Sequence, residues 1–394
     1  MRTAIWLYLF MFVAFFDLHA QYPILSPFAL SLGAAPSFIG LIMGVYSLTH
    51  LPGNLIAGYG VDKYGSKFFI VCSLIVAGII LLFQSNVKDP WHLLYIRSIS
   101  GFVLAFLSPA CLSLLARIAR DRIHQSKLMA GNGLVHTLAS VVSPAAGAVL
   151  VAKIGFTTSF SVLGWILIIT GILAIFGVKE KEMLSHKADK LSSKAHIDPH
   201  GHHASQDIKE GDDSDGVAIP WLFFLIPMAL SCSQGILFFE LPLMKSARES
   251  ILTSGVFFTL VSLGALLSIS FWFLNKISPF LRTISGSIGL AAVFFGLAIQ
   301  WPIPLTVSLF LIGMAKGVIY PALAALLASI TSSSRYGRVF SLLSISYSVG
   351  AFIGPMMAGQ LRDHISSYFI AFFILMLALS LLPLRTFKSP MLTS

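Results

Sequence analysis

The sequence predicts an all-α integral membrane protein with twelve transmembrane helices arranged in two similar six-helix bundles. Three observations carry this prediction: an extremely apolar composition, twelve apolar segments, and an internal repeat. Of the 394 residues, 56% are hydrophobic and only 11% are charged, with a mean hydropathy of +0.87. Because a soluble globular domain carries about 25% charged residues, most of the surface of this chain is expected to face lipid.

Twelve segments are apolar and approximately long enough to cross a bilayer, which requires about 20 apolar residues. They span residues 4–30, 37–61, 67–86, 91–116, 128–152, 157–178, 220–245, 254–275, 283–301, 303–331, 336–361 and 367–387. The first segment imitates a signal peptide, but its apolar character continues past Asp17 to Leu32, which favours a membrane span.

The basic residues between the segments predict the orientation in the membrane. One set of breaks, together with both termini, holds 13 Lys and Arg residues, whereas the alternate set holds 5. Since cytoplasmic loops carry an excess of Lys and Arg, we expect both termini to be cytoplasmic, in a multi-pass protein of the cytoplasmic membrane. The same distribution assigns the net charge of +10 to membrane orientation, so no nucleic-acid partner is expected.

Residues 179–219 form one long hydrophilic segment between the two sets of six spans. Their composition is typical of a flexible linker, which predicts bundles at 1–178 and 220–394. The linker contains five of the eleven histidines: His186, His196, His200, His202 and His203. Metal binding by this tract is an alternative to simple solvation, but no ligand spacing defines a metal site, and none is predicted.

An internal repeat relates the two halves at an offset of 212 residues. Gly101, Pro109 and Ala110 in the fourth segment overlay Gly313, Pro321 and Ala322 in the tenth. At nearly the same offset, Ser143-Pro144 overlays Gly354-Pro355. Because each half has an even number of spans, we expect the halves to share one orientation, with a solute site between them near the middle of the membrane.

The loop between the second and third segments reads Gly58-Tyr-Gly-Val-Asp62-Lys63-Tyr-Gly65-Ser-Lys67. It resembles the signature G-x-x-x-D-[RK]-x-G-x-[RK] of the major facilitator superfamily. Glycine at these positions permits close packing and a tight turn, and an acid at a helix end can pair with a cation or a helix dipole. The resemblance covers essentially the whole chain and implies that this loop acts as a conformational latch.

Two further motifs resemble the same family. Arg97-Ser-Ile-Ser-Gly101 is similar to its R-x-x-x-G pattern, which implies a role in proton coupling; an arginine that snorkels to the membrane surface is the alternative. The family's antiporter motif is degenerate in the fifth segment and better kept in the eleventh; generic packing of small residues is the alternative. The motif residues are Ser143, Pro144, Gly147, Gly350, Gly354, Pro355 and Gly359.

A few ionisable residues fall inside the apolar segments, where a charged group is costly unless it faces a cavity or a partner. Asp17 and Glu240 lie in the first span of each half, and Lys316 and Arg97 are the matching cations. The candidate proton or solute pathway therefore comprises Asp17, His19, Arg97, His136, Glu240 and Lys316. The alternative is a set of fixed ion pairs that hold the halves in register.

Together these features predict a secondary active transporter that moves a small solute by alternating access, with proton-coupled efflux as the leading hypothesis. Two acids and two cations suggest a zwitterionic or partly anionic solute. An importer, a metallophore exporter and a transport-inactive sensor or scaffold are the alternatives. The sequence has no P-loop, H-E-x-x-H or G-x-S-x-G motif, so no enzyme and no cofactor are predicted, and a monomer is expected.

Overall fold

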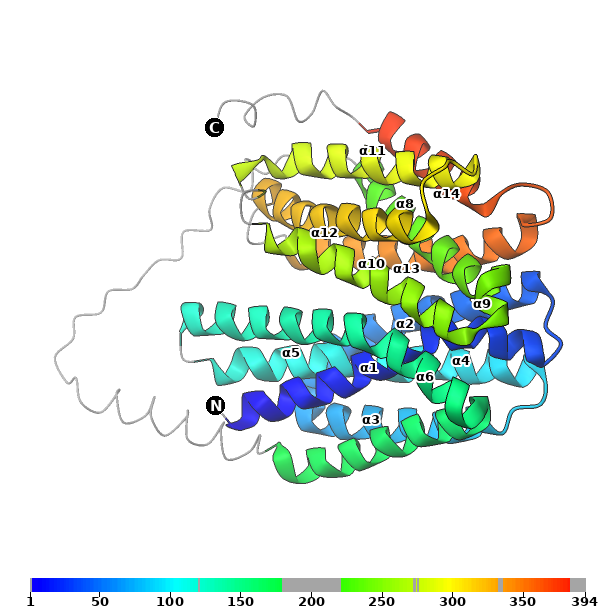
Figure 1. Ribbon diagram of the computed structural model, residues 1–394. Helices are drawn as coiled ribbons and strands as arrows, with labels where there is room; N and C mark the ends of the chain where they lie inside the picture. Colours follow the sequence, from blue (N-terminus) through cyan, green and yellow to red (C-terminus); the bar gives the residue numbers. More distant parts are fainter. Residues whose placement is uncertain are drawn as a thin grey trace, which may run out of the picture.

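A computed structural model describes residues 2–119, 121–178, 221–271, 274, 276–331 and 336–382. The predicted linker at 179–219 lies outside these residues. Every regular element in the described part of the chain is helical (Figure 1). The elements are α1 (Arg2–Ser31), α2 (Pro36–Tyr64), α3 (Ser66–Ser85), α4 (Pro90–Leu104), α5 (Leu107–Ile118), α6 (Arg122–Gly177), η1 (Trp221–Phe224), α8 (Leu225–Glu240), η2 (Leu241–Leu243), α9 (Lys245–Glu249), α10 (Ile251–Ser270), α11 (Pro279–Ala298), α12 (Leu305–Ile330), α13 (Tyr336–Leu361) and α14 (Ser367–Ser380).

Ten helical segments in the described residues are long and apolar enough to span a membrane. One of them, Ile123–Gly177, has 55 residues and would extend about 80 Å at about 1.5 Å per residue, far more than the ~30 Å hydrocarbon core. Gly155 divides it, with φ 76° and ψ 173°, into two crossings. With the shorter apolar helix Ser367–Ser380, these segments make the twelve predicted spans.

Short sequence signals set the helix ends. Proline occupies the first turn of α2, α4 and α11, where a missing N–H costs nothing. The Asp89 carboxylate accepts a 2.8 Å hydrogen bond from the Trp91 amide at the start of α4, and Asp121 caps α6 in the same way. These two acids are therefore helix caps.

Several edges differ from the sequence predictions. The predicted span 91–116 is broken at Ala105–Phe106 into α4 and α5, because Pro109 cannot donate the amide hydrogen bond that a continuous helix would require. The span predicted at 220–245 ends in the short 3₁₀ turn η2, which contains Pro242. Pro23, in contrast, is accommodated inside an unbroken α1.

The two halves repeat the same helix contacts. In the first half α4 packs on α2, and α6 packs on α1; in the second half α12 packs on α10, and α13 packs on α8. A Cβ atom on Gly101 would meet the Tyr46 carbonyl oxygen of α2, and one on Gly313 would meet the Val261 carbonyl oxygen of α10. The glycines matched by the 212-residue offset thus allow equivalent close helix approaches.

Figure 1 shows the two halves as layers whose helices run roughly parallel. We call the end that carries the α2–α3 turn the basic end, because Lys63, Lys67, Arg117 and Lys127 lie on the helix ends and turns there. The other end is called the opposite end. The halves contact each other through α2 with α13 and through α6 with α10.

The inter-half contacts gather from mid-helix to the opposite end. A Cβ on Gly40 of α2 would meet the backbone of Pro355 in α13, and one on Gly359 of α13 would lie 2.5 Å from the Pro36 carbonyl oxygen. Ser254 of α10 donates a 3.4 Å hydrogen bond to the Pro23 carbonyl of α1. At the basic end, by contrast, α2, α5 and α13 line a cavity of about 530 Å³. The halves are thus closed together at the opposite end and separated by a cavity at the basic end.

Candidate functional site

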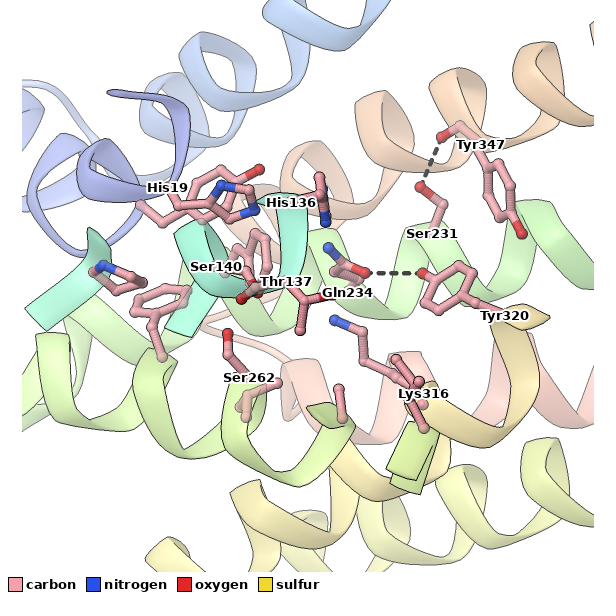
Figure 2. Close-up of a pocket in the computed structure, with 18 of the residues that line it drawn as sticks. His19, His136, Thr137, Ser140, Ser231, Gln234, Ser262, Lys316, Tyr320 and Tyr347 are labelled. Carbon is pink, nitrogen blue, oxygen red and sulfur yellow. Dashed lines mark hydrogen bonds between the residues drawn. The ribbon is translucent and has the colours of Figure 1, made fainter. Parts of the chain in front are cut away.

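A cavity of about 430 Å³ lies between the halves near the middle of the helices. Its wall comes from α1 and α6 on one side and from α8, α10, α12 and α13 on the other (Figure 2). The polar lining residues are His19, Tyr22, His136, Thr137, Ser140, Ser231, Gln234, Ser262, Lys316, Tyr320 and Tyr347. No carboxylate belongs to this wall among the described residues. A space of this size with apolar walls and few polar groups is typical of small-molecule sites.

Lys316 supplies the cation of the cavity. Its Nζ lies 5.5 Å from the centre of the Phe238 ring and 6.0 Å from that of Tyr320. Within the described part of the chain it has no carboxylate partner. Figure 2 shows the ammonium extending into the cavity toward Gln234 and Thr137. Ring faces attract a cation only modestly, so the charge is available to a solute.

Two histidines stand on the other side of the cavity. The rings of His19 in α1 and His136 in α6 have centroids 5.2 Å apart and meet edge to face. His19 Nδ1 lies 2.6 Å from the Phe15 carbonyl oxygen; since that oxygen only accepts, Nδ1 carries a hydrogen and Nε2 is the remaining polar atom. No group of three metal-ligating side chains occurs among the described residues.

Aromatic side chains form an apolar patch on the cavity wall. The rings of Tyr22 and Phe238 are 4.5 Å apart, and those of Phe238 and Phe258 are 5.1 Å apart. Because Tyr22 belongs to α1 and the two phenylalanines to α8 and α10, the patch crosses between the halves. Tyr320 donates a 2.8 Å hydrogen bond to Gln234 Oε1, which orients the Gln234 amide so that its NH₂ group remains a donor.

Asp17 belongs to a buried network beside the cavity. Gln21 Nε2 donates to both carboxylate oxygens of Asp17 at 3.0 Å, and Gln21 Oε1 accepts a 3.0 Å hydrogen bond from Arg97. Gln84 donates a further bond to Gln21 at 3.3 Å. Gln21 therefore links the acid to the arginine, and all four side chains are buried.

Arg97 is 4% exposed, which rules out the predicted alternative of a side chain that snorkels to the membrane surface. Its guanidinium lies 4.7 Å from the centre of the Tyr46 ring. A second cavity of about 120 Å³ touches Arg97 and shares Tyr22, Gln234 and Phe238 with the central cavity. The network is thus separated from the solute-sized space by a single layer of side chains.

Glu240 does not lie on the wall of the central cavity, contrary to the expectation that both intramembrane acids face it. It forms an ion pair with Arg362 at 3.3 Å, and Ser367 donates a 2.7 Å hydrogen bond to it. These partners join the end of α8 to the end of α13 and the start of α14, at the opposite end. A buried charge must be paired, but the sequence does not say with which partner.

In the predicted latch loop, Gly65 has φ 89° and is the C-cap of α2 as well as the N-cap of α3. This conformation fits the predicted tight turn. Gly58 differs from its prediction, because a Cβ there would meet open space rather than a packed helix. Lys63 lies 5.2 Å from the ring centre of Tyr64, and Lys67 lies in the first turn of α3. The side chain of Asp62 lies outside the described part of the structure.

The residues of the predicted packing motif occupy close helix contacts. Within the second half, a Cβ on Gly350 or Gly354 of α13 would meet carbonyl oxygens of α8, while the Pro355 carbonyl and Gly359 face α2 in the other half. In α6, a Cβ on Gly147 would meet the backbone of Ala20 in α1. Ser143 and Pro144 lie one turn earlier, and the Pro144 carbonyl faces α10. The motif on α13 thus serves packing both within a half and between the halves.

The chain is similar in sequence to proteins that are named for efflux or drug resistance. The chain is 23% identical over 351 residues to a protein of Lactococcus lactis subsp. lactis (strain IL1403) named "Multi-drug resistance efflux pump PmrA homolog", covering 87% of this chain and 84% of that one. It is 22% identical over 335 residues to "Multidrug resistance protein MdtG" of Escherichia coli (strain 55989 / EAEC), covering 81% and 77%.

A solved structure has the same fold. A bacterial homolog of the human lysosomal transporter Spinster, in an inward-facing and occupied conformation, superposes with a TM-score of 0.75 at 14% sequence identity, covering 98% of both chains. The family model described as "Major Facilitator Superfamily" matches residues 7–303 and 281–391. With twelve spans, two repeated halves and a cavity between them, this chain belongs to the major facilitator superfamily of membrane transporters.

Proposed function

We propose that this transporter is a proton-coupled exporter that carries a small amphipathic solute out of the cell by alternating access. The observation that supports it most is the central cavity, which both halves build and which is closed toward the opposite end. By the excess of Lys and Arg, the basic end is cytoplasmic, and the proposed orientation puts both termini on the cytoplasmic side. The two bundles, 1–178 and 220–394, then move about the cavity as units joined by the linker at 179–219.

The coupling step is assigned to the Asp17 network. A deprotonated Asp17 accepts two hydrogen bonds from Gln21, which in turn accepts one from Arg97. Protonation of Asp17 removes the negative charge that balances the buried Arg97 and turns one carboxylate oxygen into a donor. The smaller cavity beside Arg97 reaches Gly235 of α8 and Pro355 of α13. The change of charge on Asp17 therefore acts next to the interface between the two halves.

The relatives support the direction of transport. The Lactococcus protein is named an efflux pump and the Escherichia protein a multidrug resistance protein. In the structure the basic end has the cavity between the halves, and the opposite end is closed. Solute capture from the cytoplasm followed by release outside is the cycle that fits these features under the orientation proposed above.

The experiment is transport into inverted membrane vesicles energised by respiration. Vesicles with the protein are expected to accumulate one or more members of a panel of fluorescent amphipathic anions, cations and neutral compounds, and a protonophore is expected to abolish accumulation. Asp17→Asn should abolish the gradient-dependent part, whereas the matched control Asp363→Asn, at an exposed aspartate of the opposite end, should not. Accumulation that survives the protonophore, or that Asp17→Asn leaves unchanged, would contradict proton coupling through Asp17.

A further inference from the structure

The charge of the central cavity points to a specific class of solute. The nitrogen bases that meet or adjoin its space are cationic or neutral: Lys316, His19, His136 and the more distant Arg97. The other titratable groups on the wall are the phenols of Tyr22, Tyr320 and Tyr347. The two acids inside the predicted spans are engaged elsewhere: Asp17 with Gln21, and Glu240 with Arg362. An anion that enters therefore finds a cation and meets no carboxylate on the wall.

The geometry points to a solute that is an aromatic or similarly flat organic anion, and we propose that Lys316 pairs with its carboxylate, sulfonate or phosphate group. This inference rests on the proposed function only in taking the central cavity as the solute site. The Lys316 ammonium is held over the Phe238 and Tyr320 rings and extends into the cavity (Figure 2). The two ring faces do not accept hydrogen bonds from the ammonium in the way that an oxyanion does, so an oxyanion would supply the missing acceptor.

Hydrogen-bond donors stand beside the ammonium. The NH₂ group of Gln234 has no partner among the described residues, because Tyr320 occupies only its oxygen. Figure 2 shows the Lys316 ammonium directed toward the Gln234 amide. An oxyanion accepts from both, whereas an ammonium solute would place like charges together and leave the Gln234 donor unused.

The apolar part of the solute has its own surface. Tyr22, Phe238 and Phe258 form a continuous aromatic patch with ring separations of 4.5 and 5.1 Å. Flat rings stack on such a patch with offset or edge-to-face geometry. The cavity of about 430 Å³ has room for a fused two-ring body together with its charged group. The site therefore selects on two features at once, a negative head and a flat apolar body.

The test is equilibrium binding to the full-length protein in lipid nanodiscs, without any gradient. The probes share a naphthyl body: 1-naphthaleneacetate, 2-naphthalenesulfonate and 1-naphthyl phosphate as anions, 1-naphthaleneacetamide as the neutral form, and 1-naphthylmethylamine as the cation. At least one anion is expected to bind about tenfold or more tightly than the amide and the amine, the size expected for one charge-assisted contact. Equal binding of all five, preference for the amine, or no binding of any anion would overturn the proposal.

Variants of Lys316 test whether this residue is the source of the preference for anions. Lys316→Met should abolish the preference for the anion, Lys316→Arg should keep it, and Lys316→Glu should reverse it toward the amine. The matched control Lys153→Met, at an exposed lysine of α6, should bind like the unmodified protein. A full anion preference in Lys316→Met would overturn the assignment. The comparison of probes on the unmodified protein tests the proposal even if a variant does not fold.

The two proposals fail separately. Anion-selective binding without gradient-driven transport would contradict the proposed export and leave the anion site standing. Gradient-driven transport of naphthylmethylamine in preference to the naphthyl anions would overturn the anion site and leave proton-coupled export standing.

Discussion

Breaking the Glu240–Arg362 pair separates a structural role for Glu240 from a role in proton transport. The change is Arg362→Met, which removes the 3.3 Å ion pair and the hydrogen bond to the Leu243 carbonyl while keeping an unbranched side chain. The side chains are 9% and 23% exposed for Glu240 and Arg362 respectively, so the carboxylate is left in a largely dry position. Removing one partner of a buried pair costs about 3–5 kcal/mol.

Two features of the structure place the expected loss of stability toward the lower end of this range. Ser367 still donates its 2.7 Å hydrogen bond to Glu240, and the partly exposed Arg362 position admits some water. We therefore expect Arg362→Met to lower the free energy of unfolding by about 2–4 kcal/mol. Glu240→Gln should cost less, about 1–2 kcal/mol, because the neutral amide keeps the shape and needs no counter-charge.

The assay is a double-mutant cycle. Unfolding is followed by tryptophan fluorescence in mixed micelles with increasing sodium dodecyl sulfate, for the two single variants and for Glu240→Gln with Arg362→Met. We expect the free energy of unfolding of the double variant to fall by less than the sum of the two single losses, with a difference of at least about 1.5 kcal/mol. Glu240→Gln should also retain proton-driven transport. Strict additivity, or loss of proton-driven transport at unchanged stability, would refute the reasoning and return Glu240 to the proton pathway.

Three further predictions follow from individual contacts. Gln21→Leu should lower the free energy of unfolding by about 2–4 kcal/mol, since it leaves Asp17 and Arg97 buried without the side chain that links them. Detergent unfolding measures this loss, and a value below about 0.5 kcal/mol would be inconsistent with a bridging role. Gly40→Val should open the opposite end, measured as faster thiol labelling of an introduced cysteine there, whereas Gly289→Val, where a Cβ meets open space, should not. Gly155→Ala should cost about 1–3 kcal/mol because φ 76° with ψ 173° is a region for glycine; an unchanged unfolding midpoint would contradict this.

Much of the fold could be predicted from sequence because the membrane imposes a simple rule. A helix must be apolar over about 20 residues to cross the bilayer, so hydropathy alone locates the spans. The fixed offset between Gly101 and Gly313 predicts the repeat, since a glycine at a close helix approach cannot be replaced without moving backbone. The break after Leu104 was not predicted, because a proline does not by itself say whether its helix breaks: the equivalent Pro321 lies inside the unbroken α12.

The candidate site could be predicted only for its charged and titratable members. His19, His136 and Lys316 stand out because ionisable groups are rare and costly inside spans, and the structure brings them to one cavity. Gln21 and Gln234 were missed, since uncharged polar residues are ordinary in a membrane helix and the sequence does not give their direction. The signal available was spacing: Gln21 follows Asp17 by four residues, which puts both on one helix face.

Glu240 shows that the energetic cost of burying a charge predicts the need for a partner but not which residue the partner is. The rule that a buried acid needs a partner is satisfied, but the partner is Arg362, at the opposite end of the helices, rather than a cation of the cavity. The proposed solute class changes accordingly, because a cavity wall with Lys316 and no described carboxylate favours an anion over the zwitterion that two acids and two cations suggest.

The central claim is that the two halves alternate access to the cavity between them, and paired distance measurements test it most directly. Spin labels at Leu55 and Phe340, on opposite sides of the cavity at the basic end, and at Lys88 and His364, exposed at the opposite end, report the two ends separately. The background variant replaces the free cysteines with alanine at Cys72, Cys111 and Cys232.

In nanodiscs shifted from mildly alkaline to mildly acidic buffer, with the best-bound naphthyl anion present and absent, we expect the two distances to change in opposite directions. The Leu55–Phe340 distance should gain a shorter population while the Lys88–His364 distance gains a longer one. Distances that remain fixed under every condition, or that lengthen and shorten together, would contradict alternating access about this cavity.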